Sequence, residues 1–181
     1  MLTYLNVIVY TREYNNIYKR KVIIDSMVVF IQYLITILIA YLGLIVGSII
    51  SYFAKEELKP GKLYFTISSN ALIAIIIAAI LTKFHIAFPI IVAFAVFTYL
   101  HFVPAKMRWL YIASSVFIGI AVKDDALLII QATFIFLLGA VFAALEYKEK
   151  DKLKQNIINI VKETYPFLVV AIILFFVMQL I

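Results

Sequence analysis

Side chains that could contact a ligand or an ion are rare in the apolar parts of this 181-residue sequence, and Asn70 is the most prominent of them. It lies near the middle of an apolar stretch, beside Ser68 and Ser69. An amide facing lipid would lack hydrogen-bond partners, so we expect Asn70 to face the interior of a helical bundle. Two interpretations follow: Asn70 links helices through a group such as Gln131, or Asn70, Ser68, Ser69 and Gln131 line a polar cavity that contacts a substrate or an ion.

The ionisable side chains lie at the ends of the apolar stretches. Asp124 and Asp125 could form an acid–base or metal-binding set with Glu146, but adjacent helical residues point about 100° apart, which favours a solvated loop. His85 and His101 are 16 residues apart, at opposite ends of one expected helix, and cannot ligate the same metal ion. A charge at the centre of a span costs about 2.5–3.5 kcal/mol and usually marks a proton or ion path. The sequence places none there, which argues against an ion-coupled mechanism.

Catalytic and cofactor signatures are also missing from the sequence. The chain has no cysteine, which excludes disulfides, thiolate nucleophiles and cysteine-ligated metals. Patterns such as G-x-S-x-G, H-E-x-x-H and the P-loop do not occur. We therefore predict no catalytic residues, no metal site and no cofactor.

The first apolar stretch carries a small-residue motif, Gly43-xxx-Gly47-xxx-Ser51. Small residues four positions apart share one helix face and let another helix approach closely in lipid. Similar faces are expected around Gly139 and Ala140. The motif predicts either packing within the chain or a homo-oligomer contact.

Six long runs of the sequence contain no Asp, Glu, Lys or Arg. Hydrophobic residues make up 66% of the chain and charged residues 14%, against about half and a quarter in soluble domains. A bilayer-spanning helix needs about 20 apolar residues, a length that four of the runs reach. The composition predicts an all-α, polytopic transmembrane helical bundle forming a single domain, residues 1–181. The runs are Val28–Ala54, Leu63–Thr82, Phe84–Pro104, Trp109–Val122, Ala126–Leu145 and Phe167–Ile181.

The number of spans depends on the fourth run. Trp109–Val122 would extend only about 21 Å as a helix. We predict six spans, with five spans and a re-entrant segment as the alternative. Between the first two runs, Lys59-Pro60-Gly61-Lys62 predicts a β-turn, because Pro and Gly suit its two central positions.

Two amphipathic segments flank the apolar runs. Residues 1–26 have tyrosines at helical spacing followed by basic residues, which predicts an N-terminal interfacial helix. Residues 148–164 place Leu153, Ile157 and Val161 on one helix face, which predicts a helix in the interface plane that binds a partner. With six spans, the side of the termini holds 6 Lys and Arg residues and the other side 10. Both span counts put the Lys148–Glu163 helix in the cytoplasm.

These observations predict a small, non-catalytic, multi-pass protein of the cell membrane that acts as a membrane-embedded subunit or scaffold. Its partners would be the lipid bilayer and either other membrane subunits or further copies of the chain. The basic residues are spread over the loops, so we expect no nucleic-acid binding. A transporter or channel subunit with a polar cavity around Asn70 is the alternative, and a lipid-acting membrane enzyme is the second alternative.

Overall fold

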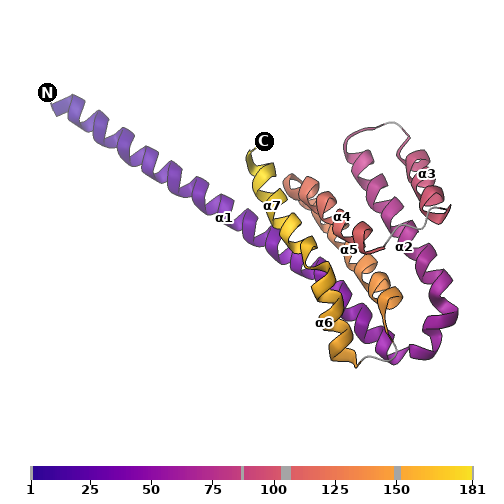
Figure 1. Ribbon diagram of the computed structural model, residues 1–181. Coiled ribbons are helices and arrows are strands. Elements are labelled where there is room, and N and C mark those ends of the chain that lie inside the picture. The colour runs from indigo at the N-terminus through magenta and orange to yellow at the C-terminus, as the bar shows by residue number, and fades with distance from the viewer. Residues whose placement is uncertain (1, 87, 103–106, 149–151, 181) are drawn as a thin grey trace. The chain divides into compact units, whose positions relative to one another are not determined.

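The computed structural model describes residues 2–86, 88–102, 107–148 and 152–180, with the backbone alone for residues 2–26. All regular structure in these residues is helical, which confirms the all-α class. The helices are α1 (Leu2–Phe53), α2 (Lys55–Lys83), α3 (Pro89–Phe102), α4 (Met107–Ile120), the short 3-10 helix η1 (Ala121–Lys123), α5 (Asp125–Glu146), α6 (Leu153–Thr164) and α7 (Pro166–Leu180) (Figure 1).

Four helical segments are long and apolar enough to cross a membrane. They are Met27–Phe53, Lys55–Lys83, Asp125–Glu146 and, taking α6 with α7, Leu153–Leu180. Helices α3 and α4 have 14 residues each, or about 21 Å. The length and composition of the four long segments support a helical membrane protein.

The chain divides into two compact units, Met1–Ile35 and Thr36–Ile181. The first unit holds the N-terminal part of α1. Its backbone is helical through the segment that the sequence assigns to the interface, residues 2–26, and continues into the first apolar run without a break. The expected interfacial tyrosines and basic residues lie among the side chains that are not described.

In the second unit, the remainder of α1 runs parallel to α5. A Cβ built on Gly43 would lie 2.7 Å from the carbonyl carbon of Phe136, and one built on Gly47 would lie 2.7 Å from that of Ala140. The two contacts follow the same order on both helices. The absence of side chains on the glycines therefore lets the two backbones touch.

Contacts within two further helix pairs, α2 with α5 and α4 with α7, show the relative directions of these helices. The Nε2 of Gln131 on α5 donates to the carbonyl of Ile76 on α2 over 3.1 Å, and Lys83 at the end of α2 forms an ion pair with Asp124 at the start of α5. Helices α2 and α5 are therefore antiparallel. Helices α4 and α7 are parallel, because the Tyr111 ring stacks on Phe167 and Gly119 meets Leu174.

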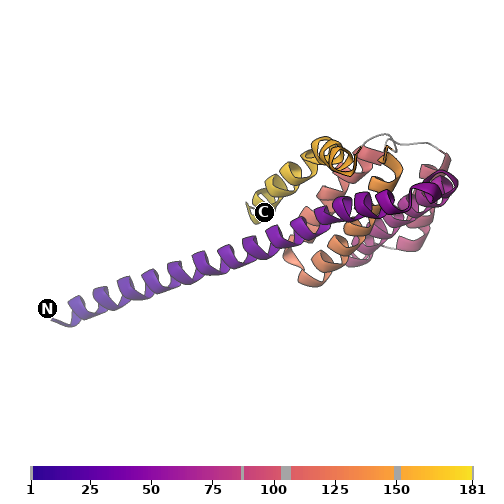
Figure 2. The same cartoon turned by 90° about the horizontal axis from the view of Figure 1, so that it is seen from below.

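Helix α3 packs against α2 and runs antiparallel to it (Figures 1 and 2). A cavity between the two helices is lined by Ala71, Ala74, Ile75 and Ala78 of α2 and by Ile90, Ala93, Phe94 and Phe97 of α3. The sequence expects a 21-residue third helix, but α3 is shorter because the chain turns after Lys83. His85 and Phe88 take left-handed φ angles of 52° and 64° there, and Pro89 begins the helix.

The β-turn expected at Lys59–Lys62 is wrong, because these residues lie inside α2. The chain reverses instead at Ala54, the single residue between α1 and α2, whose carbonyl accepts a hydrogen bond from the Glu57 amide over 3.0 Å. A proline φ of about −65° is helical, so Pro60 costs α2 one hydrogen bond without ending it.

The amphipathic helix expected at residues 148–164 forms as α6 but continues directly into α7. Tyr165, the only residue between them, has helical angles of φ −53° and ψ −29° (Figure 1). Helix α6 lies alongside α1, where the Tyr41 hydroxyl donates to the carbonyl of Val161 over 3.1 Å. Its buried residues are Asn156, Ile160 and Thr164.

Candidate functional site

The polar residues singled out in the sequence do not form one cluster. Asn70 is 1% exposed in α2, and within the described residues neither atom of its amide has a hydrogen-bond partner. Gln131 donates to Ile76, which lies six residues, or about 9 Å, along α2 from Asn70. Ser69 is buried and donates to the carbonyl of Thr66 over 2.8 Å, while Ser68 is exposed.

None of four cavities in the described part of the chain, of about 290, 220, 150 and 370 Å³, is lined by Asn70, Ser68, Ser69 or Gln131. A buried polar group without a partner costs about 1–3 kcal/mol.

A crevice of about 220 Å³ opens between the end of α1, the start of α2 and the end of α5. It adjoins a smaller cavity of about 150 Å³, because Leu58, Phe65 and Ala144 line both. The first cavity is otherwise lined by Gly47, Ile50, Ser51, Ala54, Glu57, Ala140 and Val141, and the second by Lys59, Lys62, Leu145 and Tyr147.

The small-residue motif of α1 explains where this crevice begins. At Gly47 the α1 backbone contacts Ala140 of α5 directly. One turn further on, Ser51 and Ala144 are too small to fill the space between the helices, and the crevice opens. Ser51 is 1% exposed, and its hydroxyl has no hydrogen-bond partner among the residues that the structure describes.

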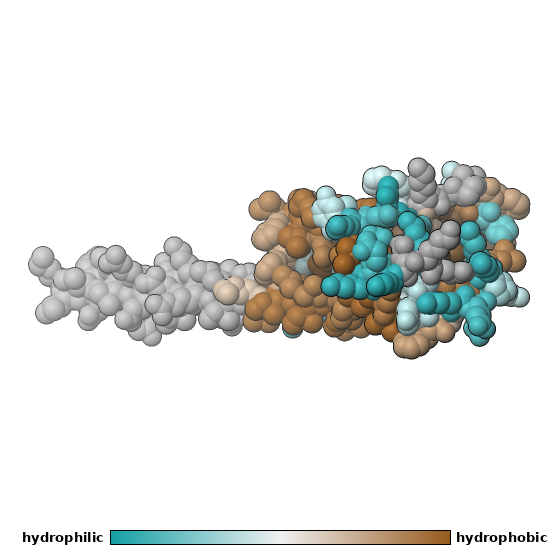
Figure 3. Space-filling view, turned by 60° about the horizontal axis from the view of Figure 1, so that its bottom comes forward, coloured by the Kyte–Doolittle hydropathy of each residue, from teal (hydrophilic) through white to brown (hydrophobic). Residues whose placement is uncertain are grey.

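Hydrophilic residues gather at one end of the bundle (Figure 3). The first turns of α2 and helix α6 contribute charged residues, among them Lys59, Lys62, Lys154 and Lys162. Asn156 holds the segment before α6: its Nδ2 donates to the carbonyl of Lys148 over 2.9 Å, and its Oδ1 accepts from the Lys148 amide over 3.0 Å. The expected partner residues Leu153, Ile157 and Val161 are half-buried on the flank of α6, and Lys154 and Lys162 are exposed.

The carboxylates considered for acid–base or metal chemistry are far apart. Asp125 and Glu146 are the first and last residues of α5, or about 31 Å from each other. Asp124 accepts a hydrogen bond from the Leu127 amide over 3.0 Å and caps α5. The Lys83 ammonium, followed by this amide, lowers the pKa of Asp124.

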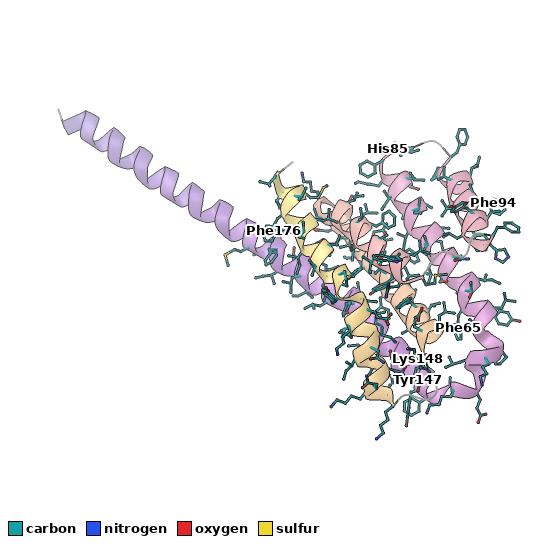
Figure 4. The ribbon with its side chains drawn as sticks, in the orientation of Figure 1. Phe65, His85, Phe94, Tyr147, Lys148 and Phe176 are labelled. Atoms are coloured by element: carbon teal, nitrogen blue, oxygen red, sulfur yellow. The ribbon has the colours of Figure 1, made fainter. Side chains whose placement is uncertain are left out.

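The two histidines are exposed, and Figure 4 shows His85 at the end of the bundle opposite Tyr147 and Lys148. His101 stacks on Phe97, with ring centroids 6.4 Å apart. Over the described residues, no three His, Asp or Glu side chains converge as a metal site would need.

The sequence does not indicate the aromatic cluster that joins four helices. Tyr111 of α4 stacks between Phe142 of α5 and Phe167 of α7, at centroid distances of 5.7 and 5.0 Å, and Phe167 also meets Tyr41 of α1 at 6.0 Å. The Tyr41 hydroxyl lies 3.1 Å from that of Thr164. Because these residues are far apart in the chain, helical periodicity could not have brought them together.

The fold and site define a class: an all-α bundle with four helical segments long and apolar enough to cross a membrane, whose charged end carries an apolar crevice. Comparison of the chain with known protein families, with curated proteins and with solved structures gives no match.

Proposed function

We propose that the protein is a non-catalytic, membrane-embedded subunit or scaffold. Its partner would dock at the cytoplasmic end of the bundle, on the flank of α6 formed by Leu153, Ile157 and Val161. The observation that carries the proposal is the character of α6, whose half-buried apolar residues Leu153, Ile157 and Val161 lie beside the exposed Lys154 and Lys162. An apolar surface bordered by charges is one that a second polypeptide can cover.

Six crossings are part of the proposal. The six consecutive segments α1, α2, α3, α4, α5 and α6–α7 alternate in direction, and α4 is one uninterrupted helix, which supports a crossing over a re-entrant loop. The excess of Lys and Arg near α6 favours the cytoplasmic side for that end.

Because the chain has no cysteine, single cysteines report the topology cleanly. Lys154→Cys and Lys59→Cys should react with a membrane-impermeant maleimide only after the membrane is opened, and Lys123→Cys should react in intact cells. Labelling of Lys123→Cys and Lys59→Cys from the same side would disprove the six-span arrangement.

The partner surface is tested by Ile157→Ser with Val161→Ser, followed by purification from native membranes and measurement of the oligomer mass. We expect the complex to lose a component or to shrink, while the bundle keeps its melting temperature to within a few degrees. Lys154→Ser, on the exposed face of α6, serves as the matched control. Unchanged mass and composition in the double variant would refute the scaffold function.

A transporter or channel subunit is the second candidate, and the unpaired amide of Asn70 is what favours it. Asn70→Leu distinguishes the two. A scaffold should gain about 1–2 kcal/mol of stability when the unpaired amide is removed, with assembly intact. A transporter should lose its substrate flux or substrate-dependent stabilisation.

A further inference from the structure

The crevice at the charged end of the bundle combines an apolar interior with a basic mouth. Its interior is bounded by small or apolar residues from α1 and α5, including Ala54, Ala140 and Ala144. Its mouth is bounded by Lys59 and Lys62 of α2. Helix–helix crevices with basic residues at the membrane surface suit the headgroups of anionic lipids.

We propose that this crevice binds one anionic phospholipid, with part of an acyl chain along the small-residue interior and the phosphate beside Lys59 and Lys62. The proposal concerns a lipid site and does not depend on the scaffold function of α6. Phe65, labelled in Figure 4, lines both cavities and lies where the glycerol backbone would sit, while Tyr147 lines the smaller cavity beside Lys59 and Lys62.

The buried hydroxyl of Ser51 gives independent support. Among the buried hydroxyls of α1, Ser48 donates to the carbonyl of Leu44 over 2.8 Å, whereas Ser51 lines the crevice with its Oγ unpaired in the described structure. A phospholipid brings ester carbonyls below its phosphate. A hydrogen bond from the Ser51 hydroxyl to an ester carbonyl would satisfy this group.

Charge complementarity decides which headgroup fits. Lys59 and Lys62 line the smaller cavity, and Glu57 lines the larger one. Ammonium groups beside the phosphate favour a headgroup with a net negative charge over a zwitterionic one.

To test this, the purified full chain in detergent micelles is titrated with dioleoyl phosphatidylglycerol and, separately, with dioleoyl phosphatidylcholine. Native mass spectrometry then counts the bound lipids. We expect one phosphatidylglycerol to bind more tightly than phosphatidylcholine. Lys59→Gln or Lys62→Gln should each weaken that binding about 5-fold, and the double variant about 30-fold, since a basic residue near an anionic surface contributes about 1 kcal/mol. Glu57→Gln should strengthen it, and Lys154→Gln should change it less than 2-fold.

Two further variants probe the interior. Ala144→Leu fills the space shared by both cavities and should abolish retention of the lipid, and Ser51→Ala should weaken it while Ser48→Ala does not. If Ala144→Leu fails to fold, the exposed lysine variants still decide the question. Equal binding of the two lipids, equal loss in Lys62→Gln and Lys154→Gln, or a dimer of this chain in place of the lipid-bound monomer would each overturn the proposal.

Discussion

Helices α3 and α4 are both apolar and both 14 residues long, yet the bundle holds them very differently. In α3, all of whose residues are described, Leu100 alone is buried. In α4 the buried residues are Tyr111, Ser114, Ser115, Ile118 and Gly119. Length and mean hydropathy therefore do not tell which of two apolar helices enters the core.

The difference comes from the size of the side chains that each helix offers to its neighbours. The hydroxyls of Ser114 and Ser115 donate to carbonyls of α4 itself, both over 2.6 Å, so α4 can bury them. Gly119 lets Leu174 of α7 approach closely. Lipid tails are as apolar as leucine, so association in a membrane depends on such close packing. Helix α3 instead faces α2 across a cavity of about 370 Å³, with Phe94 70% exposed.

The largest difference in stability between the two helices is expected when a leucine is introduced into each of them. Gly119→Leu should destabilise the bundle by about 3 kcal/mol, because a Cβ there would lie 2.8 Å from the Leu174 Cβ. Ala93→Leu should change the stability by less than about 1 kcal/mol or raise it, because Ala93 lines the cavity beside α2. Denaturation in mixed detergent micelles measures both, and equal losses would contradict the contrast.

Truncating one aromatic residue on each helix is expected to have the next largest effect. In lipid the transfer term largely cancels, so Tyr111→Ala should cost mainly its cavity, about 2 kcal/mol for roughly 100 Å³. Phe94→Ala, on the exposed face of α3, should stay within about 0.5 kcal/mol. Tyr111→Phe is the control and should keep or raise the stability, since the buried Tyr111 hydroxyl is unpaired in the described structure. The same denaturation curves give all three values.

The smallest effect is expected from changing Asp124, which follows α4 and η1. Asp124 forms an ion pair with Lys83, and no ion pair is seen for the described residues of α3. The folded-state pKa of Asp124 is lowered. Its stabilising contribution is therefore fully present above the unfolded value of about 3.9 and is lost as the pH falls through the folded value. Asp124→Asn should flatten the pH dependence of the melting temperature below pH 4, and an unchanged slope would show that the pair contributes nothing.

The sequence predicted correctly those features that depend on one helix at a time. The charge-free runs locate the helices because a buried or lipid-facing backbone must bond within its own segment. The clearest error, the turn at Pro60 and Gly61, arose because both residues are compatible with a turn and with a helix. Which one forms depends on the reversal at Ala54, one residue after α1 ends.

The candidate site was only partly predictable. Its small residues, Gly47, Ser51 and Ala144, stand out at four-residue spacing, but nothing in the sequence tells that the seam between α1 and α5 closes at Gly47 and opens at Ser51. Asn70 stands out as strongly, yet it is buried and lines none of the four cavities described.

Composition and the order of apolar runs determine by themselves that this chain is an all-helical protein suited to a membrane, because the cost of burying charge and unpaired backbone acts on each segment separately. The tertiary structure alone decides which helices enter the core, that Tyr111 and Phe167 meet, and that the crevice lined by Ser51 adjoins the cavity lined by Lys62. These outcomes depend on contacts between residues that are distant in the chain. At such contacts the size of one small side chain, or the absence of a Cβ in glycine, determines whether two helices touch.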